Sequence, residues 1–179
     1  PVRPVQLAVA LRAPARAGRV PYIAARGDTD LPQGLIRTRG DAGQALQAMG
    51  RPLTGAHEQI VGVLRNRLGQ NHGELLAIPK LEADGGIAWS TGQAGAALPA
   101  AQLPEDERGK LQQRAERMLA EIRGLAQQLR GEGPASQALA QMLERAAQQP
   151  PGDWLYSVAG RPVLVMWGHA APGTPVPAA

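Results

Sequence analysis

The C-terminal quarter of this chain constrains its fold more than any other part. Residues 154–167 hold two of the three Trp residues and one of the two Tyr residues, in a chain without Phe. Alternating apolar side chains predict two short strands here, joined at Ala159-Gly160. The second strand, from Val163 to Trp167, is apolar on both faces, which is typical of a covered, central strand. We therefore expect this segment to build a core and not to perform chemistry.

The strongest helical pattern covers residues 105–131. Pro104 and the acidic residues after it favour a helix start, because acids stabilise the positive end of the helix dipole. Gly133 follows the end of this helix, and Pro134 begins a second one. The short connection predicts a helical hairpin over residues 105–149. Its expected buried positions are Leu111, Ala115, Met118, Leu119, Ile122, Leu125, Ala126 and Leu129 in the first helix, and Leu139, Met142, Leu143, Ala146 and Ala147 in the second.

The chain before residue 100 carries weaker and shorter patterns. Its periodicity, capping residues and turn residues indicate short strands and short helices. The expected elements are strands at 5–11 and 20–25, a loop at 27–40, a short helix capped by Asp41 and ending at Gly50, a helix capped by Thr54 and ending at Gly69, a turn at 71–73, and a hairpin of strands 74–81 and 87–91 around Asp84-Gly85-Gly86.

Length and composition favour one domain of the α+β class. A chain of 179 residues can bury a sizeable core, and without Cys it can form neither disulfides nor thiolate metal sites. The order of the elements predicts an antiparallel sheet of about four to six strands packed on the helical hairpin. We expect a single domain over residues 1–169. Residues 170–179 are rich in Ala and Pro, which is typical of a linker or a disordered tail.

No motif in the sequence predicts a catalytic, cofactor or metal site. His57 lies at a helix start, His72 in a turn and His169 at a strand end, and no pair has metal-ligand spacing. We expect surface or capping roles for them, with His169 the first choice if one has a function. The acidic pairs Asp28 and Asp30, and Glu82 and Asp84, are typical turn formers. The chain is therefore expected not to be an enzyme and to need no cofactor.

The net charge is +4, and almost all of the positively charged residues are Arg. Four cations, Arg12, Arg16, Arg19 and Arg26, come closest to a binding patch for an anionic partner. Aromatic residues that stack on bases are missing beside them, so nucleic-acid binding is not expected. No run of 18 apolar residues is present to span a bilayer.

Four pieces of the chain together resemble a known family. They are 75–79 (LLAIP), 86–89 (GIAW), the acidic helix start 103–108 (LPEDER) and 155–168 (LYSVAGRPVLVMWG). In this order they resemble the N-terminal region of the SrfA-type virulence factors of Gram-negative bacteria, over roughly residues 60–168. The chain differs in having Trp89-Ser90 where relatives often have Trp-Tyr, and Met166-Trp167 where an aromatic pair is common.

The resemblance implies a membrane-attached, multi-domain protein encoded beside companion proteins. This chain would be the part ahead of a linker and a membrane segment, cytoplasmic and tethered to the inner membrane in the full-length protein. We therefore expect a non-enzymatic scaffold or adaptor domain that binds a protein encoded nearby, with Trp89, Trp154, Arg12 and Arg16 as candidate contacts. Two alternatives stay open: a hydrolase using Asp28, Asp30 and His72, and a binder of anionic lipid or nucleic acid through Arg12, Arg16, Arg19 and Arg26.

Overall fold

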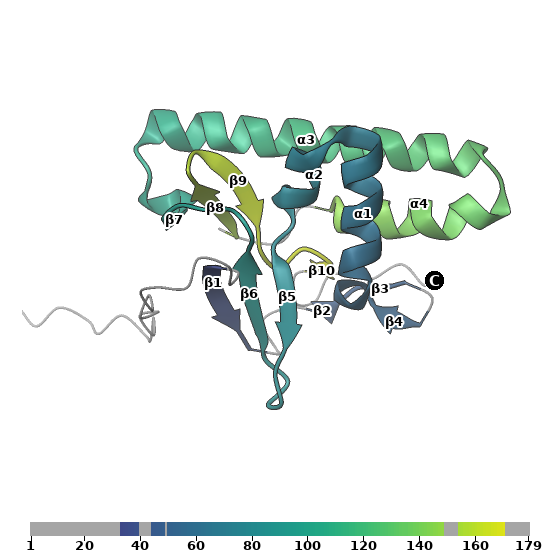
Figure 1. Ribbon diagram of the computed structural model, residues 1–179, viewed down its shortest axis with the longest axis horizontal. Helices are drawn as coiled ribbons and strands as arrows, with labels where there is room; N and C mark the ends of the chain where they lie inside the picture. Colours follow the sequence, from purple (N-terminus) through teal and green to yellow (C-terminus); the bar gives the residue numbers. More distant parts are fainter. Residues whose placement is uncertain (1–32, 40–43, 49, 149–153, 171–179) are drawn as a thin grey trace, which may run out of the picture.

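The computed structural model describes residues 33–39, 44–48, 50–148 and 154–170 (Figure 1). Helices and antiparallel strands are mixed along the chain, so the expected α+β class is confirmed. Four α-helices and two 3₁₀ helices lie in the described part: η1 (Leu53–Ala56), α1 (His57–Leu68), α2 (Gln70–Leu75), η2 (Ala100–Gln102), α3 (Glu105–Gly131) and α4 (Pro134–Ala146). None of these helices is long and apolar enough to cross a membrane.

The strands of the described part divide into small antiparallel sheets in place of one larger sheet. The hairpin sheet has the order β1-β6-β5, and the core sheet has the order β7-β8-β9. The hairpin sheet contains β1 (Gln33–Thr38), β5 (Ile78–Leu81) and β6 (Ile87–Thr91); the core sheet contains β7 (Ala97–Pro99), β8 (Leu155–Val158) and β9 (Arg161–Leu164). Two further pairs join β2 (Gln44–Ala45) to β10 (His169–Ala170) and β3 (Gln47–Ala48) to β4 (Arg51–Pro52).

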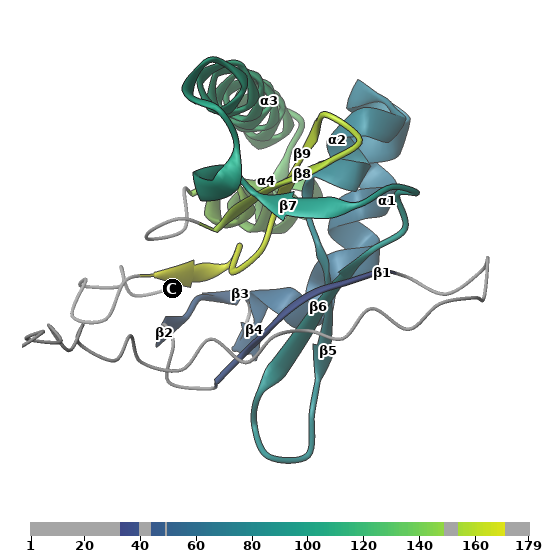
Figure 2. The same ribbon diagram turned by 90° about the vertical axis from the view of Figure 1, so that its left-hand side faces the viewer.

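The helical hairpin forms as the sequence predicts. Helix α3 has the expected bounds, and all eight apolar positions expected to face inward are buried. Helix α4 packs along α3 and ends at Ala146, a few residues earlier than expected. The residues predicted to face inward in this part of the chain are buried, except Leu139, which is half-buried. Helix α3 also contacts β9, α1 and α2, so it lies over the core sheet and the first two helices together (Figure 2).

The C-terminal segment is the centre of the core, as expected. Ala159 and Gly160 form a two-residue turn between β8 and β9, and both have positive φ (49° and 75°), the signature of a type I′ turn. Strand β9 is flanked by β8 on one side and by a parallel bridge from Leu164 to Leu76 on the other. The Trp167 side chain is fully buried, and its Nε1 donates to the Ala77 carbonyl at 2.8 Å.

Several expectations for the region before residue 82 are wrong. Strand β1 occupies part of the expected loop at 27–40, and β2 and β3 replace the expected helix at 41–50. Strands β1 and β2 pair with distant partners, whereas β3 pairs with the nearby β4, and the region buries Leu35 and Leu46. Thr54 lies inside η1 and does not cap α1. The expected turn at 71–73 is helix α2, so the strand expected at 74–81 begins only at Ile78.

Other expectations for this region are confirmed or lie beyond the described residues. Helix α1 ends at Leu68, directly before the predicted stop at Gly69, whose φ of 102° only glycine adopts readily. Strands β5 and β6 form the expected hairpin around residues 84–86. The strands expected at 5–11 and 20–25, and most of the tail at 170–179, lie outside the described residues.

Candidate functional site

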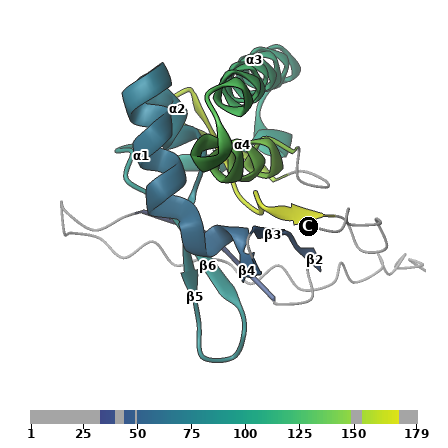
Figure 3. The same ribbon diagram turned by 90° about the vertical axis from the view of Figure 1, so that its right-hand side faces the viewer.

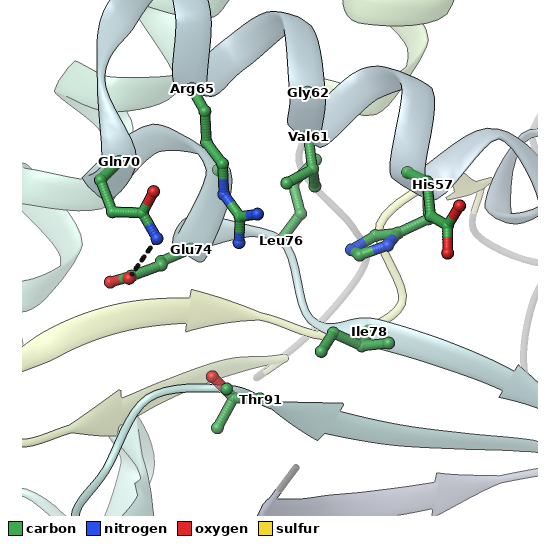
Figure 4. A pocket seen from close by; sticks show the side chains of 12 residues that line it. His57, Val61, Gly62, Arg65, Gln70, Glu74, Leu76, Ile78 and Thr91 are labelled. Carbon is green, nitrogen blue, oxygen red and sulfur yellow. Dashed lines mark hydrogen bonds between the residues drawn. The ribbon is translucent and has the colours of Figure 1, made fainter. Parts of the chain in front are cut away.

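A cleft of about 450 Å³ lies between helices α1 and α2 and the ends of β5 and β6 (Figure 4). Its size falls within the range of small-molecule pockets, which is roughly 300–1,000 Å³. Val61, Leu76 and Ile78 give it an apolar surface, and the side chains of His57, Arg65 and Thr91 add polar groups. No sequence motif predicts this cleft, because the residues that line it come from separate elements.

Arg65 reaches into the cleft across a glycine. Figure 4 shows its side chain passing from α1 toward the gap between Glu74 and Leu76. A Cβ built on Gly73 would lie 2.6 Å from the Arg65 Cγ, so only glycine leaves room for this path. Gly73 is inside helix α2, where glycine costs up to about 1 kcal/mol relative to alanine. The close approach of Arg65 gives a structural reason for accepting this cost.

The Glu74 carboxylate beside Arg65 already has its partners. Its Oε1 accepts from Gln70 Nε2 and its Oε2 from Arg161, each at 2.9 Å. Within the described part of the chain, the Arg65 guanidinium has neither an ion pair nor a hydrogen bond to a side chain. The cleft therefore contains a cation beside a carboxylate that already pairs with another arginine.

His57 lies at the other end of the cleft and joins it to the core. Its ring is 5.7 Å from the Trp167 ring, centroid to centroid. Burial lowers the pKa of His57 below its ordinary value of 6.5. A hydrogen bond to the Leu76 backbone and the charge of Glu58 oppose this lowering of the pKa. The charge of Arg65 adds to it. The His57 Nε2 is buried without a hydrogen-bond partner in the described part. The His57 ring thus brings a buried, unsatisfied polar atom to this end of the cleft.

The other two histidines also make contacts that the sequence did not predict. His169 is buried, its Nδ1 lies 3.3 Å from the Trp167 carbonyl oxygen, and burial lowers its pKa below 6.5. His72 Nε2 lies 2.6 Å from Glu121 Oε2, which links α2 to α3. The expectation of three surface or capping histidines is therefore wrong for His169. His57 does start a helix, as expected, but its ring is half-buried.

The residues predicted as partner contacts have different surroundings. Trp89 is only 1% exposed, and its Nε1 donates to Thr38 Oγ1 at 2.9 Å, so it is a core residue and presents no surface to a partner. Trp154 is half-buried against the core and keeps some exposure. Arg12 and Arg16 lie outside the described residues, as do Arg19, Arg26, Asp28 and Asp30.

A second surface feature is the tip of the β5–β6 hairpin. This hairpin projects from the body on the side away from α3 (Figure 1, Figure 2 and Figure 3). Arg37 from β1 forms ion pairs with both Glu82 and Asp84 at the tip. A hydrogen bond from the Gly86 backbone and the Arg37 guanidinium hold the pKa of Asp84 below its ordinary value of 3.8. Beside this clamp, Leu81 is 75% exposed.

The described residues contain no group of three or more His, Asp or Glu side chains placed to hold a metal ion. Comparison of the chain with protein-family models, curated proteins and solved structures finds no match. The cleft and the hairpin tip are therefore the two surface features from which a function can be inferred.

Proposed function

We propose that this chain is a non-enzymatic interaction domain, a scaffold or adaptor of a bacterial virulence- or envelope-associated protein, and that the β5–β6 hairpin contacts its protein partner. The observation that carries the proposal is the exposed Leu81 on a projecting hairpin whose tip is fixed by Arg37. Leu81 is the most exposed large apolar side chain of the described residues.

A fixed tip favours binding for an energetic reason. Association costs roughly 0.5–1.5 kcal/mol for each mobile side chain that it immobilises, and ordering a loop adds to that cost. Here the turn is already held by the two ion pairs and by the bond from the Gly86 N–H to Asp84 Oδ1 at 3.0 Å. An apolar partner pocket that covers Leu81 therefore gains burial energy without ordering the hairpin first.

The edge of the hairpin favours contact through side chains over strand addition. Strand β5 is an edge strand of the hairpin sheet, and it contains Pro79 and Lys80. Proline has no N–H to donate, and both residue types are common devices against pairing of exposed edges. The partner is thus expected to take Leu81 as an anchor in a pocket, with Lys80 and the acidic tip at the rim.

The resemblance to the SrfA-type proteins supports the choice of partner. It implies companion proteins encoded nearby, and we propose one of these as the partner, with the full-length protein cytoplasmic and tethered to the inner membrane. The alternatives gain no specific support. His72, which the hydrolase hypothesis requires, is bound to Glu121, and the carboxylates and arginines of both alternatives lie outside the described residues.

Site-specific photo-cross-linking tests the proposal. A photoreactive amino acid is placed at position 81 in the full-length protein, in the cells that encode it, and a matched variant carries it at position 98. Leu98 is the other exposed large apolar residue of the described part, 45% exposed, and it lies in the core sheet, on β7. We expect a discrete adduct with one companion protein from position 81 alone. Equal adducts from both positions, or none from position 81, would contradict the proposal.

A further inference from the structure

From the cleft, we infer that this protein binds a carboxylate carried on an aliphatic chain, with the carboxylate on Arg65 and the chain over Val61, Leu76 and Ile78. This site is separate from the β5–β6 hairpin, so the inference does not depend on the proposed function.

The Arg65 side chain is held in place and has no side-chain partner among the described residues. Its stem lies against Gly73, where any side chain would collide with it, so the guanidinium is directed into the cleft by packing. The neighbouring Glu74 is bound by Gln70 and Arg161. A positioned guanidinium without a partner is the usual receptor for a carboxylate, which it binds with two parallel hydrogen bonds.

Charge selects a carboxylate over a phosphate. The carboxylates that line the cleft are Glu58 and Glu74, and Glu74 is paired with Arg161. Among the described residues that line the cleft, Arg65 is thus an unpaired arginine and Glu58 an unpaired carboxylate. These two residues are seven positions apart on α1, about 10 Å along a helix. A monoanion can lie at the Arg65 end, whereas a phosphate dianion lacks a second cation and would also meet the field of Glu58.

The rest of the cleft defines what the carboxylate is attached to. Between Arg65 and His57 the lining includes Val61, Leu76 and Ile78, which suits an aliphatic chain. Beyond them lies His57, whose Nε2 has no partner in the described part. An extended peptide of three residues covers about 10 Å. Two sources fit this chemistry: a free aliphatic acid, and the C-terminal carboxylate of a peptide with an aliphatic last residue.

Calorimetric titration of the whole 179-residue chain tests the inference and separates the two sources. The probes are 4-methylpentanoate, N-acetyl-Ala-Ala-Leu with a free carboxylate, the same peptide amidated, and inorganic phosphate. We expect the free-carboxylate peptide or 4-methylpentanoate to bind, and the amidated peptide to bind about tenfold more weakly or not at all. Tighter binding of the peptide identifies a peptide terminus, and equal binding identifies a small acid.

Variants decide whether the cleft is the site. Arg65→Gln should weaken binding about tenfold or more, and Gly73→Ala should weaken it by displacing Arg65. The matched controls are Arg67→Gln, which removes an arginine of α1 that pairs with Glu132, and Gly124→Ala in α3, where an added Cβ meets nothing within 4 Å. Neither control should change affinity, and circular dichroism checks that each variant folds.

A second readout uses the histidine at the end of the cleft. A bound peptide whose carboxylate lies on Arg65 and whose chain reaches the other end of the cleft should shift the His57 ring protons in NMR spectra, and Arg65→Gln should abolish that shift at the same peptide concentration. Three results would overturn the inference: equal affinity for the amidated peptide, tighter binding of phosphate, or unchanged affinity in Arg65→Gln. Absence of binding by every probe would overturn it as well.

Discussion

The core sheet and the hairpin sheet each have three antiparallel strands, but different interactions stabilise them. In the core sheet, β9 and the residues after it are buried on both faces, with Val163, Val165 and Trp167 fully covered. In the hairpin sheet, β6 buries only alternate residues, and β5 ends in the exposed Leu81 beside an ion-paired tip. One sheet is held by apolar burial, and the end of the other is held by charge.

The two sheets are expected to contribute differently to the stability of the domain. Burial of apolar side chains contributes most of the folding free energy, whereas exposed ion pairs contribute little. Changes at the tip of the hairpin sheet should therefore leave the fold intact, and changes in the core sheet should not. The hairpin can present a surface to a partner without weakening the domain.

The largest expected effect is that of Trp167→Ala. This change leaves a cavity in the core, which typically costs about 3–5 kcal/mol, and it leaves the Ala77 carbonyl without the bond from Trp167 Nε1. Denaturant-induced unfolding followed by far-UV circular dichroism measures the loss. Trp167→Phe is the control, because it keeps an aromatic ring and should cost less. A loss below about 1 kcal/mol for the alanine variant would place Trp167 outside the core.

A smaller effect, of opposite sign, is expected at the turn of the core sheet. Ala159 has a φ of 49°, a conformation that costs an L-residue about 1–2 kcal/mol and that asparagine adopts more readily. Asparagine followed by glycine is the preferred pair for a type I′ turn, so Ala159→Asn should stabilise the protein by about 0.5–1 kcal/mol. Ala159→Val is the matched opposite and should destabilise it, because a branched side chain fits this φ poorly. A melting temperature that moves in the reverse order would show that the turn is not under strain.

The two sheets also differ in how well the sequence predicts them. The β8–β9 and β5–β6 hairpins and helix α3 have local patterns: alternation, a turn pair or a continuous stripe such as Leu111 to Leu129. Strands β1 and β2 have no such local pattern. Strand β1 pairs with the distant β6, and β2 is two residues long and pairs with β10 at the other end of the described chain. Their pairing is set by tertiary contacts, which no single-sequence pattern contains.

The candidate site was harder to predict than the fold. Arg65 and Gly73 meet because α1 and α2 pack closely, and the glycine looked like part of a turn at 71–73 because nothing local marked it as helical. A glycine that follows an arginine by eight residues has no general meaning. Trp89 was predicted as an exposed anchor, yet its alternation with Ile87 and Thr91 along β6 was a signal for burial. Arg37 was missed as a clamp because its strand was expected to be a loop.

The smallest effect on stability, and the sharpest probe of the hairpin tip, is expected for Arg37→Ala. The ion pairs of Arg37 are exposed, so the free energy of unfolding should not change measurably. The titration of Asp84 should change, because Arg37 is one of the groups that lower its pKa. A lowered carboxyl pKa stabilises the folded tip above the ordinary value of 3.8, and this contribution is lost as the pH falls through the pKa of the folded state.

The Gly86 amide proton, which is bonded to Asp84 Oδ1, reports this titration in NMR spectra. Its midpoint should move upward in Arg37→Ala but stay below 3.8, because the Gly86 bond, the larger cause of the lowered pKa, remains. Arg39→Ala, a neighbouring exposed arginine, should leave the midpoint where it is. The Trp167 indole proton shows whether the core is still folded at each pH. If the midpoint does not move in Arg37→Ala while that signal persists, the tip is held by its turn alone. The contrast between a sheet held by burial and a tip held by charge would then no longer apply.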